Sequence, residues 1–174
     1  VNDAPVAVND TTSTLEDVNV TLQVVTTNDS DVDGLLNTNI DLNLGVGGVQ
    51  NTITTPNGVY TNDGNGNVTF DPNPNWFGTD STPYIVCDLG TPMPAKCDTA
   101  MIYVTVVPVN DPPVILPDPK TIYEDSVATV CPPNSDIDDI AANLTLTSCG
   151  ASNGTVTGPV AGCFEYTPTA NWSG

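Results

Sequence analysis

Aspartate and asparagine side chains gather in short motifs whose spacing suits the binding of a hard cation. Residues 28–34 read Asn-Asp-Ser-Asp-Val-Asp-Gly, and a shorter version of this motif recurs at 134–138. Calcium takes about six to eight oxygen ligands, several of them from carboxylates. Asp and Asn also cap backbone N–H groups in turns. We expect that second role for residues 62–64, Asn-Asp-Gly, which have no matching motif elsewhere in the chain.

The charge balance limits the partners of the chain. Its 174 residues include two lysines, no arginine, no histidine and 21 acidic residues, for a net charge of −19. This balance disfavours nucleic acid and anionic membranes, which need Lys and Arg to neutralise phosphates. Bound divalent cations would relieve the repulsion, and a solvated acidic surface is the alternative. Catalysis has little support without histidine or arginine, so we expect no enzyme.

Residues 29–34 also fit the first half of an EF-hand loop. The bidentate acid of that loop belongs at its twelfth position, which is Ile40 here. No helical periodicity flanks the segment. We therefore reject the EF-hand interpretation.

The elements that must position these motifs are β-strands. Apolar residues alternate with polar ones at 18–24, and Ile and Val alternate with Met, Tyr and Thr at 101–106. Asn-Gly, Asp-Gly and Pro mark the turns. No window shows apolar residues at helical spacing. Short strands at this spacing predict a Greek-key β-sandwich. The expected strands of the first part of the chain are 4–9, 12–15, 18–26, 39–44, 50–54, 58–61, 67–71, 82–88 and 99–107.

The sequence repeats itself after residue 108. Residues 1–6, Val-Asn-Asp-Ala-Pro-Val, recur at 109–114, and Glu-Asp follows each at the same distance. Asn-Gly to Asn-Trp-x-Gly spans 57–78 and again 153–174. We predict a first domain at 1–108 and a second at 109–174 that stops before its last two strands. Those strands would come from the chain beyond residue 174, which we favour, or from a neighbouring chain.

The order and repetition of these motifs resemble bacterial cadherin-like tandem repeats, which occur in very large surface adhesins. The end of the first domain, 84–90 and 101–113, also resembles animal cadherin repeats. The resemblance covers essentially the whole chain. It implies an all-β chain of tandem Greek-key β-sandwiches, cadherin-like or Ig-like, with Ca²⁺ bound where successive domains meet.

The resemblance also implies which residues would bind calcium. Pro108 stands where cadherins usually carry a further aspartate, and this departure removes one carboxylate. The junction between the two domains would use Glu16, Asp17, Asp80, Asn110, Asp111, Asp136 and Asp138, and an upper junction with a preceding domain would use Asn2, Asp3, Asp31, Asp33 and Asp88.

The five cysteines favour disulfides and an oxidising compartment, because the chain has no CxxC spacing and no histidine for zinc. Cys87 and Cys97 can face each other in an antiparallel hairpin, which predicts a bridge between them. In sandwiches of this kind Cys131 and Cys163 belong at the same end of the domain, so we prefer that pair. Cys149 is then free or paired beyond residue 174.

A short pattern, Asp-Ser/Thr followed by a small or apolar residue, resembles the O-glycosylation signal of Bacteroidetes-type bacteria. It occurs at Thr11, Ser81, Thr99 and Ser126.

These observations favour a calcium-rigidified spacer of a large extracellular cell-surface adhesin, whose partners are neighbouring repeats of the same protein. No membrane-spanning run of residues is present, so we expect no direct membrane insertion. A second hypothesis is a subunit of an extracellular filament in which other copies complete the fold by strand donation. A third is a carbohydrate-binding module, which needs an exposed aromatic platform.

Overall fold

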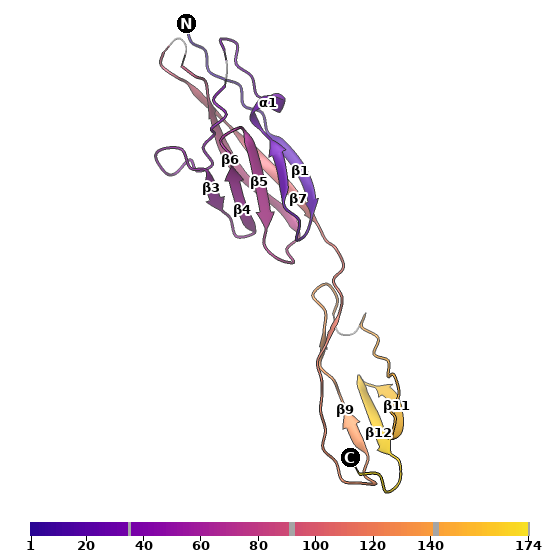
Figure 1. Ribbon diagram of the computed structural model, residues 1–174. Helices are drawn as coiled ribbons and strands as arrows, with labels where there is room; N and C mark the ends of the chain where they lie inside the picture. The colour runs from indigo at the N-terminus through magenta and orange to yellow at the C-terminus, as the bar shows by residue number, and fades with distance from the viewer. Residues whose placement is uncertain (35, 91–92, 141–142, 174) are drawn as a thin grey trace. The chain divides into compact units, whose positions relative to one another are not determined.

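The protein forms two compact units of β-strands. The computed structural model describes residues 1–34, 36–90, 93–140 and 143–173, so Gly174 of the second Asn-Trp-x-Gly motif lies outside the described residues. The units are Val1–Val109 and Asn110–Gly174 (Figure 1). The predicted all-β class is confirmed.

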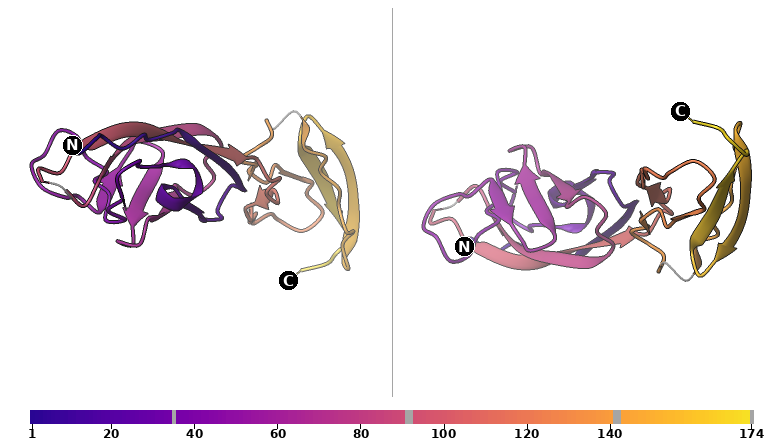
Figure 2. Two further views of the ribbon diagram at one scale, coloured as in Figure 1. Left: turned by 90° about the horizontal axis from the view of Figure 1, so that it is seen from above. Right: turned by 90° about the horizontal axis from the view of Figure 1, so that it is seen from below.

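The first unit is a sandwich of two sheets (Figures 1 and 2). One sheet has the order β1-β7-β6, with β1 parallel to β7, and the other has the order β2-β5-β4-β3. The strands are β1 (Asp10–Leu15), β2 (Val20–Gln23), β3 (Thr52–Thr54), β4 (Gly58–Asn62), β5 (Asn67–Pro72), β6 (Gly78–Cys87) and β7 (Cys97–Val107).

Apolar residues on alternate positions of these strands form one core between the sheets. Tyr60 and Phe70 come from β4 and β5, and Tyr84 and Val104 come from β6 and β7; all four are fully buried. Trp76 packs edge-on against Phe70, with ring centroids 6.4 Å apart. Burial of these side chains is the main source of stability of the unit.

Three segments differ from the strands expected from the sequence. The end of the expected strand 18–26 is a short helix, α1 (Val25–Asn28), and the Gln23 side chain accepts hydrogen bonds from the N–H groups of Val25 and Thr26. Residues 4–9 and 39–44 make only single bridges, at Val6 and at Asp41. The Asp41 carboxylate binds nearby backbone N–H groups, which bends the chain away from a continuous ladder.

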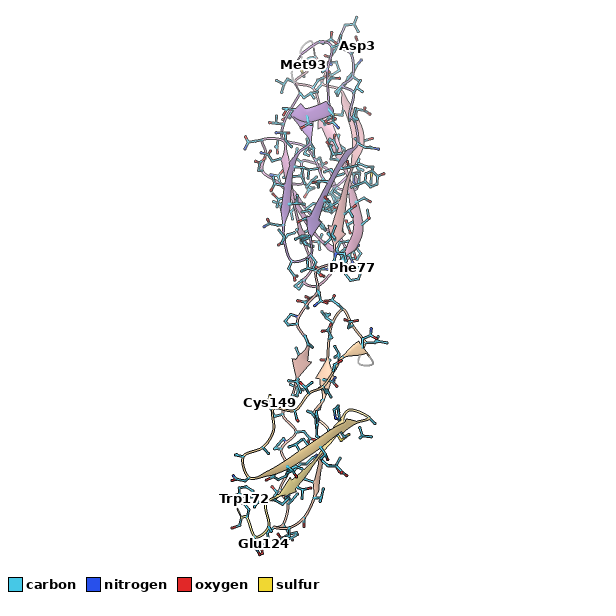
Figure 3. All side chains as sticks on the ribbon, turned by 90° about the vertical axis from the view of Figure 1, so that its right-hand side faces the viewer. Asp3, Phe77, Met93, Glu124, Cys149 and Trp172 are labelled. Carbon is cyan, nitrogen blue, oxygen red and sulfur yellow. A yellow bond between two sulfur atoms is a disulfide. The ribbon has the colours of Figure 1, made fainter. Side chains whose placement is uncertain are left out.

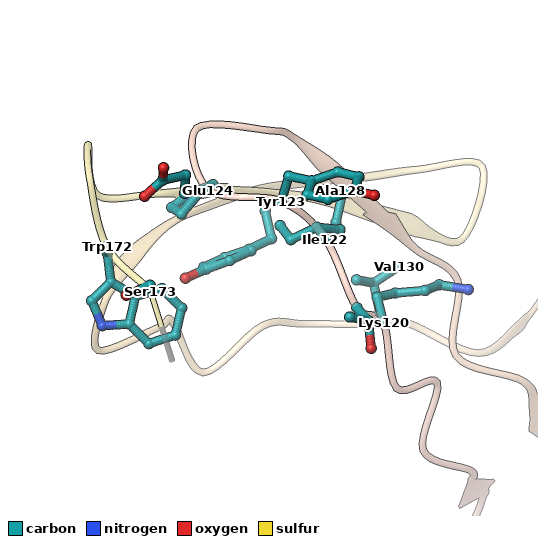
Figure 4. A pocket seen from close by; sticks show the side chains of 11 residues that line it. Lys120, Ile122, Tyr123, Glu124, Ala128, Val130, Trp172 and Ser173 are labelled. Carbon is teal, nitrogen blue, oxygen red and sulfur yellow. The ribbon is translucent and has the colours of Figure 1, made fainter.

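The second unit has a smaller set of strands. β8 (Val114–Ile115) pairs with β10 (Asn134–Ser135), and β12 (Cys163–Pro168) lies between β11 (Gly154–Val160) and β9 (Ala128–Val130). Among the described residues of this unit no strand takes the places of β6 and β7. One face of the sheet that contains β9 and β12 holds a pocket of about 560 Å³, which is lined in part by Tyr123, Tyr166 and Trp172 (Figure 4).

The structure contains both disulfides expected from the sequence. Cys87 and Cys97 are paired residues at the ends of β6 and β7, and their bridge closes this hairpin. Cys131 and Cys163 are bridged within the second unit. Cys149 is a free, exposed thiol.

Candidate metal-binding site

The Asp-x-Asp loop of the first unit is held by its own carboxylates. Asp31 Oδ1 accepts hydrogen bonds from the N–H groups of Asp33 and Gly34, at 2.7 and 3.0 Å. The Asp33 carboxylate accepts the N–H of Asp3, which lies in the segment before β1. Asp31 Oδ2 is buried and has no hydrogen-bond partner. A buried carboxylate oxygen without a donor fits a hard cation, which would satisfy it.

The second unit repeats this arrangement. Asp136 Oδ1 accepts the N–H groups of Asp138 and Asp139, both at 2.9 Å. Asp138 Oδ2 accepts the N–H of Asp111 at 2.6 Å. Each repeat therefore fixes its linker aspartate to the second aspartate of its loop.

The other upper-junction residues form a second contact in the first unit. Asn2 Nδ2 donates to Asp88 Oδ2 at 2.7 Å, and Lys96 Nζ donates to the Asn2 carbonyl at 2.5 Å. Burial opposes ionisation of Asp88, but hydrogen bonds from Asn2, Gly90 and Lys96 hold its pKa below the usual value. Asp88 therefore stays ionised. Asp3 and Met93 lie at one end of this unit, and Phe77 lies at the other (Figure 3).

Two predicted ligands at the Phe77 end have partners inside their own unit. Asp17 Oδ1 accepts the N–H of Asn75 at 2.9 Å, and Asp125 makes the same bond to Asn171 in the second unit. Glu16 Oε1 accepts the N–H of Val109. Glu16 therefore reaches the linker, whereas Asp17 holds the loop that carries Trp76.

Asp80 is held by three side chains of its own unit. Its carboxylate accepts hydrogen bonds from Tyr60 Oη at 3.1 Å, Thr55 Oγ1 at 3.1 Å and Asn57 Nδ2 at 2.7 Å. Its exposed fraction is 6%. These bonds give Asp80 a structural role that the sequence did not predict.

The structure thus divides the predicted ligands. The upper set lies within the first unit as two separate contacts, Asn2 with Asp88 and Asp3 with Asp33. No three carboxylates among the described residues of that unit converge within 4.8 Å. The junction set is shared: the first unit carries Glu16, Asp17 and Asp80, and the second carries Asn110, Asp111, Asp136 and Asp138.

Two other sequence interpretations concern the acidic motifs. The turn role expected for residues 62–64 is confirmed, because Asp63 Oδ1 accepts the N–H groups of Asn65 and Asn67. Ile40, at the twelfth position of the rejected EF-hand loop, has 1% of its surface exposed and belongs to the core.

The candidate glycosylation positions lie on the surface. Thr11, Ser81 and Thr99 are exposed on β1, β6 and β7, and Ser126 is half-buried in the second unit. The hydroxyl groups of Thr11, Ser81 and Thr99 are accessible on the outer face of the β1-β7-β6 sheet.

One group of interacting acids was not singled out from the sequence. Asp10 and Asp29 lie near Tyr84 inside the first unit. The signal that could have found them is the recurrence of Asp10 as Asp118, nine residues after the valine that opens each repeat.

Comparison with known proteins identifies the family of the chain. The family model described as bacterial Ig domain matches residues 2–105 and again 110–174. The chain belongs to the bacterial Ig domain family. The two matches agree with the tandem repeat found in the sequence.

No curated protein matches the chain. It is similar to a solved structure described as titin domains z1z2 in complex with telethonin, with 11% identity, 99% of this chain and 84% of that chain covered, and a TM-score of 0.37. A chimeric titin Z1Z2 carrying a peptide from decorin has 11% identity, coverage of 99% and 85%, and a TM-score of 0.31. Among the described residues, no helix is long and apolar enough to span a membrane.

Proposed function

We propose that these two bacterial Ig domains are calcium-rigidified spacer repeats of a large extracellular cell-surface adhesin. The observation that carries this proposal is the bond between the linker aspartate and the Asp-x-Asp loop, made by Asp3 in one repeat and by Asp111 in the other. The same preorganised set of oxygen atoms therefore stands at the start of both repeats. A preorganised set binds a hard cation with less ordering of its ligands.

Calcium at the junction would connect the two units mechanically. Glu16 would contribute from the first unit, and Asp111 and Asp138 from the second. Without a cation these carboxylates repel one another, so the linker is free to bend. With calcium bound, the units would hold a fixed angle, and a series of such repeats would project a distal binding domain from the cell surface.

The chemistry of the chain supports a structural rather than a catalytic role. Members of Ig-like families are typically structural domains, and the chain has no histidine or arginine for acid–base or oxyanion chemistry. The two disulfides suit an extracellular compartment. Its partners would be neighbouring repeats of the same protein.

Replacing Asp111 by alanine is expected to loosen the junction without unfolding either unit. The linker would lose a carboxylate, and extracellular calcium modules bind with a Kd of about 10⁻⁴–10⁻³ M, so one lost ligand empties the site at millimolar calcium. Small-angle X-ray scattering should give a narrow distribution of shapes for the wild-type chain in calcium, and a broad one for the variant.

Asp71→Ala is the matched control, because Asp71 is an exposed aspartate of β5 and the same charge is removed. It should scatter like the wild type, and chelation with EDTA should broaden both. Equal, narrow distributions for all chains with and without calcium would show that packing alone holds the junction.

A second candidate function, a filament subunit, is favoured by the pocket on the second unit. Tyr123 is 88% exposed there and Trp172 is 37% exposed, whereas their counterparts in repeat position are Leu15, which is 50% exposed, and Trp76, which packs against the core of the first unit. A strand donated by another copy would cover this face. Sedimentation that shows growing oligomers, reversed by Tyr123→Ser, would support donation, and a monomer at all concentrations would exclude it.

A carbohydrate-binding module finds less support. Trp76 packs on Phe70 and Tyr60 is fully buried. Exposed aromatic side chains of the first unit, Phe77 and Tyr103, lie on different elements and form no platform that the structure shows.

A further inference from the structure

Asp10 is a buried carboxylate without a complete set of partners. It is the first residue of β1, pairs with Ile102 of β7, and has 7% of its surface exposed. Its Oδ2 atom is buried and has no hydrogen-bond partner. A buried acceptor in this state costs about 1–3 kcal/mol unless a donor or a cation satisfies it.

Oxygen atoms of three other residues surround this part of the unit. The Tyr84 hydroxyl, on β6, bonds both carboxylate oxygens of Asp29 at 2.9 Å. Asn28, the last residue of α1, donates through Nδ2 to the carbonyls of Val8 and Asn9. Those bonds fix the amide orientation, and Asn28 Oδ1 is left buried without a partner.

The electrostatics show that these groups face one another. Burial raises the pKa of Asp10 to about 6, the Tyr84 hydroxyl opposes the rise, the charge of Asp29 adds to it, and the Asn28 side chain also opposes it. Burial likewise raises the pKa of Asp29, and the charge of Asp98 on β7 adds to that rise. Two acidic side chains, Asp10 and Asp29, therefore lie close together in this region.

Neither lysine of the chain neutralises them. Lys96 Nζ bonds the Asn2 carbonyl, and Lys120 lies in the second unit. The sequence has no arginine. Among the described residues, no cationic side chain is recorded beside Asp10.

In the second repeat, a lysine side chain neutralises the equivalent acid. Asp118 occupies the repeat position of Asp10, and Lys120 Nζ lies 2.8 Å from its Oδ1. The N–H of Cys131 donates to Asp118 Oδ2 at 2.8 Å. Ser30 and Ser135 are bridged residues at equivalent positions of the two repeats. Asp29 precedes Ser30, whereas Asn134 precedes Ser135, so the second repeat lacks the second acid. The first repeat has Thr12 in the position of Lys120 and keeps both acids.

We propose that the first repeat binds a hard divalent cation, Ca²⁺, inside the domain at Asp10, Asn28 and Asp29, in the role that the Lys120 ammonium has in the second repeat. Two carboxylates, an amide oxygen and the neighbouring Tyr84 hydroxyl give an all-oxygen set of the kind calcium prefers. The cation would satisfy both unpartnered atoms, Asp10 Oδ2 and Asn28 Oδ1. None of these residues belongs to the junction sets, so this site does not depend on the proposed function.

The test counts calcium ions in the full chain at pH 7.5. Isothermal titration calorimetry is performed on Asp111→Ala, in which the junction is impaired, and on the same chain carrying Asp10→Asn. Terbium serves as a second probe, because Tyr84 should sensitise its emission. We expect Asp10→Asn to remove one bound ion and the sensitised emission.

Thr12→Lys provides a second variant that keeps every proposed ligand. The new ammonium should replace the ion as in the second repeat, so that calcium affinity at this site falls at least about tenfold. Thr12→Gln and Asp71→Asn are controls for size and for charge, and both should retain the ion. Thr12→Lys also decides the question if Asp10→Asn fails to fold.

The outcomes for the two proposals are separable. If Asp10→Asn and Thr12→Lys bind as many ions with the same affinity as their parent chain, the intradomain site is wrong and the junction proposal is untouched. If Asp111→Ala leaves both ion binding and scattering unchanged while Thr12→Lys abolishes one ion, the junction proposal is wrong and the intradomain site is supported.

Discussion

Replacing Asp80 by alanine is expected to lower the free energy of unfolding of the first unit by about 3 kcal/mol. The substitution leaves the hydroxyl of Tyr60, whose side chain is fully buried, and the donors of Thr55 and Asn57 without their common acceptor. A buried polar group that loses its partner costs about 1–3 kcal/mol. Guanidinium denaturation should show the loss in EDTA as well as in calcium.

The measurement needs a signal from the first unit alone. A Trp172→Phe background leaves Trp76 as the sole tryptophan, and its ring packs against Phe70 in the core of that unit. Asp71→Ala serves as the charge-matched control and should change the stability little. If Asp80→Ala has normal stability in EDTA and loses only its response to calcium, then Asp80 serves as a metal ligand and its structural role is minor.

Replacing Gly58 by alanine is expected to destabilise the first unit by about 3 kcal/mol or more. A methyl group at this position of β4 would overlap the Asp71 carbonyl and approach the Phe70 ring to 2.7 Å. The ring is fully buried and the carbonyl belongs to the neighbouring strand, so neither can move aside easily. Overpacking of this kind costs about 1–3 kcal/mol, and sometimes more.

Gly47→Ala is the matched control. Nothing lies within 4 Å of an added methyl group there, and the substitution should be close to neutral. Gly154 repeats the close approach in the second unit, against Thr167 and Tyr166, so Gly154→Ala should destabilise that unit in the same way. A Gly58→Ala chain with wild-type stability would mean that β4 and β5 are not packed as closely as the structure has them.

Asp80 and Gly58 bear on the proposed function because a hydrogen bond joins the residue before Gly58 to Asp80. Asn57, next to Gly58, donates to Asp80, and Asp17 holds Asn75 of the Asn-Trp loop. The acids at this end of the first unit are therefore largely engaged in maintaining the fold. Calcium stiffening at the junction would depend chiefly on Glu16 and on the linker and loop aspartates of the second unit.

The sequence by itself determined the repeat, the β-sandwich class and the Cys87–Cys97 pair. Local patterns were sufficient because alternation places Ile102 and Val104 on one face of a strand, and because Cys87 and Cys97 flank a single hairpin. It also determined the Asp-x-Asp loops, since an Asx turn needs only residues two or three apart, as at Asp31 and Asp136.

Only the tertiary structure decided what each acid contacts. Asp80 meets Tyr60 and Asn57 across two sheets, and Asp10 meets Tyr84 and Asp29 from separate elements, at sequence separations that no local motif encodes. The helix Val25–Asn28 is a similar case, because its hydrogen bonds to the Gln23 side chain override the strand preference of its valine and threonines. The sequence around a carboxylate does not show whether its partner is a tyrosine, a turn or a cation. Burial and proximity in the folded chain determine which of these partners it has.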